Sequence, residues 1–149
     1  MTAWLEEQYI LKGKRIWVAG HSGMVGAALL RRLQSEDCEI LTAPRYDLDL
    51  RDQAAVTLWL DMNKPDVIIL AAAKVGGIMA NAAAPADFIY DNMMIEANII
   101  HGAQQAGVGK LLFLGSSCLY PKGAQNPIAE EALLSGALEP TNEAYAVAK

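Results

Sequence analysis

The sequence is poor in the residues that build metal centres and disulfide frameworks. Its 149 residues include two cysteines and two histidines. Cys38 and Cys118 are far apart in the chain and lack the spacing of metal ligands. We therefore expect no metal and no disulfide framework, and the use of cysteine predicts a protein of the reducing cytoplasm.

Basic residues and long apolar runs are scarce as well. Lys and Arg total 12 against 17 acidic residues, a net charge of −5, which argues against a nucleic-acid binder because such proteins neutralise phosphates with basic side chains. The apolar runs at 67–73 and 110–115 are far shorter than the roughly 20 residues that span a bilayer. Glu6 and Glu7 stand where a secretory signal would be apolar. We expect neither nucleic acid nor membrane as a partner.

The chain does contain an alternation of apolar runs with segments of helical periodicity. The runs predict strands at 15–19, 39–41, 66–70 and 110–114, and the periodic segments predict helices at 24–34, 54–62 and 86–106. Asp52 is a candidate N-cap, and Pro85 suits a first helical turn. This alternation predicts a single doubly wound α/β domain over 1–149, with a parallel Rossmann sheet.

A glycine motif stands between the first predicted strand and the first predicted helix. Gly20, Gly23 and Gly26 follow the spacing GxxGxxG. The first glycine permits a tight turn, the second lets backbone approach a pyrophosphate, and the third allows close packing of helix and strand. The amides at the start of the helix would then face the phosphates, which predicts a dinucleotide site.

The end of the second predicted strand bears on the choice of nicotinamide cofactor. An NAD site usually has a carboxylate there for the ribose 2′-OH, whereas a basic residue accommodates the 2′-phosphate of NADP. The chain has Arg45 and no carboxylate directly after the strand, so we favour NADP(H). Asp47 and Asp49 follow closely and keep the NAD alternative open, as does the interpretation of Arg45 as a solvated surface residue.

A second chemical pattern occupies the last part of the chain. Ser116 follows the fourth predicted strand, and after an irregular stretch at 120–140, interpreted as a loop over the site, Thr141 or Asn142 is a candidate cap for a helix that carries Tyr145 and Lys149. A tyrosine hydroxyl can protonate a carbonyl oxygen during hydride transfer when a nearby ammonium lowers its pKa. Ser116 could hold the same oxygen, so the set predicts a reductase.

Cys118 lies two residues beyond Ser116, in the loop that leaves the carboxyl edge of the sheet. Ligands of open α/β sheets bind at that edge. A thiolate there could remove a proton from a carbon beside a ketone and so epimerise a keto sugar. A free cysteine most often packs in the core without a chemical role, and the residues alone leave both interpretations open.

Together these motifs resemble the GDP-L-fucose synthase family of extended short-chain dehydrogenase/reductases. The most specific matches are Ala-Ala-Ala-Lys-Val-Gly-Gly-Ile at 71–78 and Ser-Ser-Cys-Leu-Tyr-Pro at 116–121. Further matches run in register at 18–26, 85–90, 92–96 and 138–143. The resemblance implies C3/C5 epimerisation and NADPH-dependent C4 reduction of GDP-4-keto-6-deoxy-D-mannose, giving GDP-L-fucose, in a homodimer that pairs through long helices such as 86–106.

The resemblance also implies roles for individual residues. Cys118 matches the epimerisation base, and Ser116, Tyr145 and Lys149 match the reductase triad. The implied cofactor contacts are Gly20, Ser22, Gly23, Met24, Val25, Gly26, Arg45, Asp49, Leu50, Ala71, Ala72, Ala73, Tyr145 and Lys149.

Three departures from the family pattern temper these expectations. Ser22 occupies a position where the family often has an arginine, and neither His21 nor His101 matches the family's acid for epimerisation. The later strands and the substrate-binding lobe are missing, so we expect an incomplete chain with little activity of its own and an exposed apolar sheet edge. The alternatives are an NAD-dependent sugar-nucleotide epimerase or dehydratase and an inactive cofactor-binding fragment.

Overall fold

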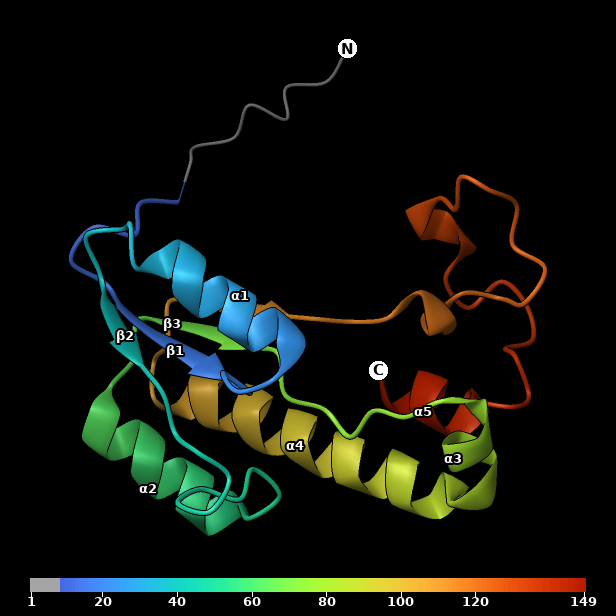
Figure 1. Ribbon diagram of the computed structural model, residues 1–149, viewed down its shortest axis with the longest axis horizontal. Helices are drawn as coiled ribbons and strands as arrows, with labels where there is room; N and C mark the ends of the chain where they lie inside the picture. The colour runs from blue at the N-terminus through green and yellow to red at the C-terminus, as the bar shows by residue number, and fades with distance from the viewer. Residues whose placement is uncertain (1–8) are drawn as a thin grey trace.

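The computed structural model describes residues 9–149 and contains one parallel sheet. Its four strands are β1 (Arg15–Ala19), β2 (Glu39–Leu41), β3 (Val67–Leu70) and β4 (Lys110–Phe113), in the order β2-β1-β3-β4 (Figure 1). All three strand pairs are parallel. The expected strands are confirmed, although β3 begins one residue later and β4 ends one residue earlier than the sequence suggested.

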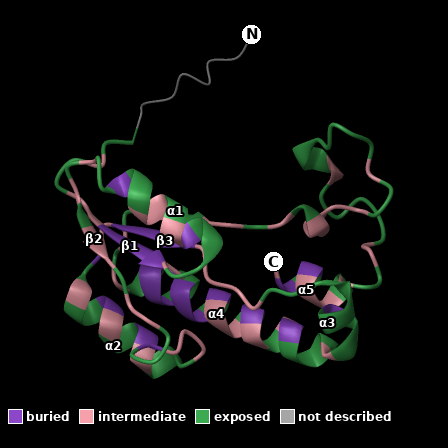
Figure 2. Cartoon of the chain, viewed as in Figure 1, coloured by how far each residue is buried: buried purple, intermediate pink, exposed green. Residues whose placement is uncertain are grey.

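Helices cover both faces of the sheet, which is the doubly wound arrangement. Helix α1 (Met24–Leu33) lies on one face, and α2 (Gln53–Asn63) and α4 (Pro85–Gln105) lie on the other (Figure 1). Successive strand residues alternate between the two sides. Ile16, Val18, Val67 and Ile69 pack toward α1, while Trp17, Ala19, Ile68 and Leu70 pack toward α2 and α4. Figure 2 shows β1, β3 and the inner side of α4 as the buried centre.

The helix ends follow their sequence signals in two cases. The Asp52 carboxylate accepts a hydrogen bond from the Ala55 amide at 3.1 Å and caps α2. Pro85 is the first residue of α4, where its missing N–H leaves no helical hydrogen bond unmade. Gly107, just beyond α4, has a φ of +72°, a left-handed conformation that favours glycine and ends the helix.

The second half of the chain contains short elements that periodicity did not reveal. These are α3 (Ile78–Ala83) and the 3₁₀ turns η1 (Ser117–Leu119) and η2 (Glu130–Ala132). The last element is α5 (Glu143–Ala148), which the sequence did predict. The predicted helix with Tyr145 is confirmed. Asn142, one of the two predicted caps, occupies the N-cap position, but its side chain makes no hydrogen bond to the helix, because its amide faces a different partner.

One edge of the sheet is formed by β4, which pairs with β3 alone. Leu111 and Phe113 pack into the core beneath α4, whereas Leu112 on the opposite face is 47% exposed. The sheet therefore presents an apolar side chain at this edge, as expected. Between residues 9 and 149, no helix has both the length and the apolar character required to cross a membrane.

Candidate functional site

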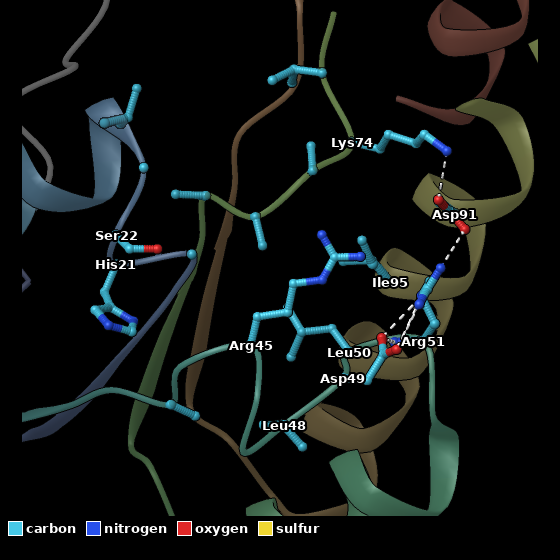
Figure 3. A pocket seen from close by; sticks show the side chains of 18 of the residues that line it. His21, Ser22, Arg45, Leu48, Asp49, Leu50, Arg51, Lys74, Asp91 and Ile95 are labelled. Carbon is cyan, nitrogen blue, oxygen red and sulfur yellow. Dashed lines mark hydrogen bonds and ion pairs between the residues drawn. The ribbon is translucent and has the colours of Figure 1, made fainter. Parts of the chain in front are cut away.

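A cavity of about 520 Å³ opens at the carboxyl ends of β1 and β3. The strand order reverses here, because β2 lies on one side of β1 and β3 on the other. Such switch points are where open α/β sheets bind ligands. Figure 3 shows three walls: the turn after β1, the segment after β2 and the segment after β3. The residues that line the cavity are Gly20, His21, Ser22, Gly23, Met24, Val25, Ala43, Arg45, Leu48, Asp49, Leu50, Arg51, Ala71, Ala72, Ala73, Lys74, Val75, Asp91 and Ile95.

The glycine turn brings two of these walls into backbone contact. Gly20 has a φ of +89°, and a Cβ there would lie 2.5 Å from the Ala72 nitrogen. Gly26 lies beneath the turn, and its Cβ would overlap the Gly20 carbonyl oxygen and lie 2.7 Å from the His21 Cα. Sequence reasoning assigned Gly26 to packing of the helix on the strand; its actual neighbour is the turn itself. A Cβ on Gly23 would meet only the Gly20 oxygen, at 3.4 Å.

The N-terminus of α1 opens into the cavity without a capping side chain. Gly23 is its N-cap, and the first turn contains no acidic residue. The first amides of a helix have no partner within the helix, and here Met24 and Val25 line the cavity. Free amides and the positive end of the helix dipole favour an anion at this position.

Arg45 reaches into the same cavity from the segment after β2 (Figure 3). Within residues 9–149 its guanidinium forms no ion pair, whereas Asp49 is engaged by Arg51 at 2.7 Å. Hydrogen bonds from Arg51 lower the pKa of Asp49 to about 2. Asp47 is exposed and does not line the cavity. Two charged groups that follow β2 therefore differ in the cavity: within residues 9–149 the Arg45 guanidinium has no ion-pair partner, whereas the Asp49 carboxylate is already bound by Arg51.

An ion-pair network that the sequence did not indicate continues from Asp49. Arg51 also contacts Asp91 of α4 at 3.0 Å, and Lys74 contacts Asp91 at 2.9 Å (Figure 3). Hydrogen bonds from Lys74 and Arg51 lower the pKa of Asp91 despite its burial. The network ties the segments after β2 and β3 to α4. Its members are 17 and 40 residues apart, so no local pattern could have identified it.

Two asparagines of α4 hold the same walls from below. The Asn92 side chain is fully buried; it accepts from the Lys74 amide at 2.8 Å and donates to the Lys74 carbonyl at 3.0 Å. Asn98 donates to the Leu50 carbonyl at 3.0 Å. Buried polar groups of this kind fix a loop because each would be costly to leave unpaired. The cavity walls are thus held in place by α4.

The predicted reductase residues lie outside the cavity lining, at the far end of the sheet's carboxyl edge. Ser116 is the N-cap of η1, and Tyr145 and Lys149 come from α5 and its C-terminal end. Helix α5 packs against both η1 and α4, so the elements that carry the set meet. Within the part of the chain that the structure describes, no hydrogen bond joins Tyr145 to Ser116 or Lys149. The expected loop over the site contributes no residue to the cavity.

Lys149 has a partner that the sequence did not suggest. Its ammonium contacts the Glu96 carboxylate of α4 at 3.1 Å and lies 4.2 Å from the centroid of the Phe113 ring. The Lys149 and Glu96 side chains are 3% and 12% exposed. Burial raises the pKa of Glu96, and the hydrogen bond from Lys149 opposes that rise. Glu96 therefore belongs to the surroundings of the predicted triad.

Cys118 is held by two hydrogen bonds. Its amide donates to the Ser116 hydroxyl oxygen at 3.3 Å, and the Asn142 side-chain amide donates to its sulfur at 3.1 Å. Cys118 and Cys38 are both free thiols. Over residues 9–149 no cluster of three or more His, Cys, Asp or Glu side chains is arranged to hold a metal ion.

Comparison with known proteins identifies the family. The model of the NAD dependent epimerase/dehydratase family matches residues 16–149. The chain belongs to this family. A GDP-L-fucose synthase from Sinorhizobium fredii is 63% identical over 141 residues, which cover 95% of this chain and 45% of that protein. The chain therefore spans less than half the length of this curated epimerase/dehydratase relative.

Solved structures of related epimerase/dehydratases agree with the fold. A GDP-L-fucose synthetase from Naegleria fowleri bound to NADP has a TM-score of 0.85 at 31% identity, covering 97% of this chain and 44% of that one. A GDP-mannoheptose C4 reductase from Campylobacter jejuni with NADP bound has a TM-score of 0.88 at 40% identity, covering 92% and 44%. The Rossmann-type fold and the resemblance to GDP-L-fucose synthases are confirmed.

The cavity of this epimerase/dehydratase chain fits the nicotinamide cofactor that its family implies. The uncapped start of α1 suits a pyrophosphate, and Gly23 leaves space for its approach. The apolar segment Ala71 to Ala73 provides a third wall. His21 also lines the cavity, and its Nδ1 is buried without a hydrogen-bond partner in the part of the chain that the structure describes. Backbone, charge and shape thus agree with a dinucleotide.

Proposed function

We propose that this chain is the cofactor-binding part of a GDP-L-fucose synthase. The substrate would be GDP-4-keto-6-deoxy-D-mannose, epimerised at C3 and C5 and then reduced at C4. The observation that carries the proposal is the position of Cys118 beside Ser116 and against α5, the helix that bears Tyr145. This arrangement combines a candidate carbon base with a candidate proton donor. The name of the 63% identical relative supports it.

The cofactor proposed for the cavity is NADP(H). It would supply a hydride to the C4 carbonyl. Arg45 would bind the 2′-phosphate, since its guanidinium lines the cavity and pairs with no carboxylate within residues 9–149. Asp49, the competing candidate for a ribose 2′-OH, is already bound by Arg51 at 2.7 Å. The amides at the start of α1 would bind the pyrophosphate.

In the reduction, Tyr145 would donate its hydroxyl proton to the C4 oxygen as that oxygen gains negative charge. Ser116 would hold the same oxygen by a hydrogen bond. The Lys149 ammonium would favour the tyrosinate that remains. Glu96, which contacts Lys149 at 3.1 Å, would keep that ammonium at the base of α5.

In the epimerisation, the Cys118 thiolate would take the proton from C3 or C5, and the bonding electrons would move into an enolate on the C4 oxygen. Return of a proton to the opposite face of the carbon would invert its configuration. The thiol would then lose its proton before the second carbon reacts. Neither His21 nor His101 matches the family's acid, so the resemblance assigns the donor for the opposite face to neither histidine.

The test uses the native gene product, whose intact mass is measured first. The protein is supplied with the keto sugar and NADPH, and the product is identified by NMR. We expect GDP-L-fucose. Cys118→Ser is expected to abolish its formation while NADPH binding stays within about twofold, because Cys118 lies outside the cavity lining. Normal fucose formation by this variant would exclude Cys118 as the base.

The cofactor preference has its own test. Arg45→Ala is expected to weaken NADPH binding by about tenfold or more, the loss of one charge-assisted contact, and to leave NADH binding unchanged. Arg31→Ala is the matched control, because Arg31 is exposed on α1 and outside the cavity. Equal losses for both cofactors in Arg45→Ala would contradict a role at the 2′-phosphate.

A second candidate function is C4 reduction of another GDP-linked keto sugar without epimerisation. Similarity to a solved GDP-mannoheptose C4 reductase, at 40% identity and a TM-score of 0.88, favours it. The two functions differ in D₂O. The fucose-forming reaction incorporates deuterium at C3 and C5, whereas simple reduction incorporates none at either carbon.

We further propose a homodimer that pairs through α4. Tyr90, Met93, Ala97 and Ile100 are exposed, and their spacing of three and four residues places them on one side of the helix. A second copy would cover this apolar stripe. Light scattering should give twice the mass of the gene product, and Met93→Glu should halve it, whereas a monomeric parent would exclude the interface.

A further inference from the structure

Asn142 lies at the start of α5 with its side chain turned away from the helix. Asparagine at an N-cap usually accepts a hydrogen bond from a backbone amide two or three residues later. Here the N-cap makes no such bond. The side-chain nitrogen instead donates to the Cys118 sulfur at 3.1 Å, across 24 residues of sequence.

The same orientation leaves an acceptor unsatisfied. The Asn142 Oδ1 atom is buried and has no hydrogen-bond partner among residues 9–149. Buried polar groups are almost always paired, and an exception points to a functional constraint. The side chain thus forgoes the cap and leaves its oxygen unpaired while its N–H group faces a sulfur. That choice leaves α5 without a side-chain cap and directs an N–H donor at the Cys118 sulfur.

We propose that Asn142 is a positioning residue for Cys118, holding its thiolate in place as the carbon base. This inference rests on the proposed function. A thiol sulfur is a weak acceptor, whereas hydrogen bonds to a charged acceptor are markedly stronger. Donation from Asn142 is therefore strongest when the sulfur carries the negative charge of the base. It also fixes the direction of the sulfur, because the Cys118 amide is bound to the Ser116 hydroxyl at 3.3 Å.

The contact also links the two half-reactions mechanically. Asn142 and Tyr145 are three residues apart at the start of one helix, and Ser116 and Cys118 belong to one 3₁₀ turn. The Asn142 to Cys118 bond joins these two elements at the reacting groups. The base and the proton donor are thereby held at a set separation while one sugar ring undergoes both steps.

The first test measures the reactivity of the thiol directly in the native gene product. Alkylation by iodoacetamide is followed against pH, and each cysteine is read separately by peptide mass spectrometry. Asn142→Leu removes the donor. We expect alkylation of Cys118 to slow by about tenfold across the pH range. Cys38 is the internal control, because burial and the charges of Glu36 and Asp37 raise its pKa independently of Asn142.

Two further variants separate this effect from loss of structure. Asn142→Asp keeps the size and the capping ability of the side chain but replaces the N–H donor with a carboxylate oxygen. We expect the same slowing or a greater one, with circular dichroism unchanged. Thr141→Ala alters the neighbouring exposed residue, whose hydroxyl donates to the Glu139 carboxylate at 3.3 Å, and should leave the Cys118 rate unchanged. An unchanged Cys118 curve in both Asn142 variants overturns the proposal.

The second test separates this inference from the proposed function. Deuterium incorporation into the keto sugar, measured in D₂O without NADPH, should fall about tenfold in Asn142→Leu. The KM for NADPH, measured separately in the complete reaction, should stay constant. If the unaltered protein incorporates no deuterium, the proposed epimerisation is wrong. The outcome is different if the unaltered protein incorporates deuterium and Cys118→Ser stops that incorporation. In that case, incorporation by Asn142→Leu at the parent rate would show that only the positioning role is wrong.

Discussion

The three motif glycines are predicted to differ in what they contribute, and Gly26 and Gly23 give the sharpest contrast. A Cβ at Gly26 would overlap the Gly20 carbonyl oxygen and lie 2.7 Å from the His21 Cα, both of them backbone atoms. A Cβ at Gly23 would meet only the Gly20 oxygen, at 3.4 Å. Gly26→Ala should therefore destabilise the fold, whereas Gly23→Ala should impair cofactor binding alone.

The magnitudes follow from these contacts. Carbon atoms pack at about 3.5 Å or more, so the turn would have to move by roughly 1 Å to admit a methyl group at Gly26. Overpacking costs about 3 kcal/mol at the upper end of its usual range, which applies where backbone must move. Alanine within a helix recovers about 1 kcal/mol, leaving a net loss of about 2 kcal/mol. For Gly23→Ala, a small capping loss and a gain in unfolded-state entropy nearly cancel, to within about 0.5 kcal/mol.

Urea unfolding followed by tryptophan fluorescence is a suitable assay, because Trp17 stacks on Trp59 with ring centroids 4.1 Å apart. A loss of about 2 kcal/mol moves the midpoint by about 1 M urea. Gly77→Ala is the control, since Gly77 has an ordinary φ of −72° and no atom within 4 Å of a Cβ. Equal midpoints for Gly26→Ala and Gly23→Ala would refute this reasoning. So would normal cofactor affinity in Gly23→Ala.

Three further predictions concern polar contacts. Asp49 has a pKa of about 2 in the folded protein against roughly 3.9 in the unfolded chain, so its contribution to stability is full above about pH 4 and is lost as the pH falls toward 2. Asp49→Asn should therefore be less stable than the parent to urea at pH 7 and equally stable near pH 2. The difference at pH 7 should be small, because the Asp49 side chain is 43% exposed. Glu96→Ala leaves the buried Lys149 ammonium unpaired and should lower the free energy of unfolding by about 3 kcal/mol. Adding Lys149→Met should recover most of that loss. Additive losses of stability in the double variant would contradict the pairing. Asn92→Ala removes three hydrogen bonds and should cost roughly 3 kcal/mol; a loss below about 1 kcal/mol by thermal unfolding would show that water replaces them.

Local signals account for much of the first half of the fold. The run at 67–70 is β-branched and apolar and forms a strand buried on both faces, and the motif around Gly20 forms the turn that its spacing predicts. These features depend on neighbours a few residues away. The capping of α2 by Asp52 and the start of α4 at Pro85 are equally local.

Long-range contacts decided what the sequence could not. Glu96 faces Lys149 across 53 residues and Asn142 faces Cys118 across 24. Asn142 had the sequence signature of a cap, but packing of α5 against η1 turns its amide toward sulfur. The sequence by itself determined the fold class and the chemical types present at each motif, because backbone preference and apolar periodicity are local. The tertiary structure alone decided which charges pair and which remain unpaired, since these depend on how distant segments meet at the edge of the sheet.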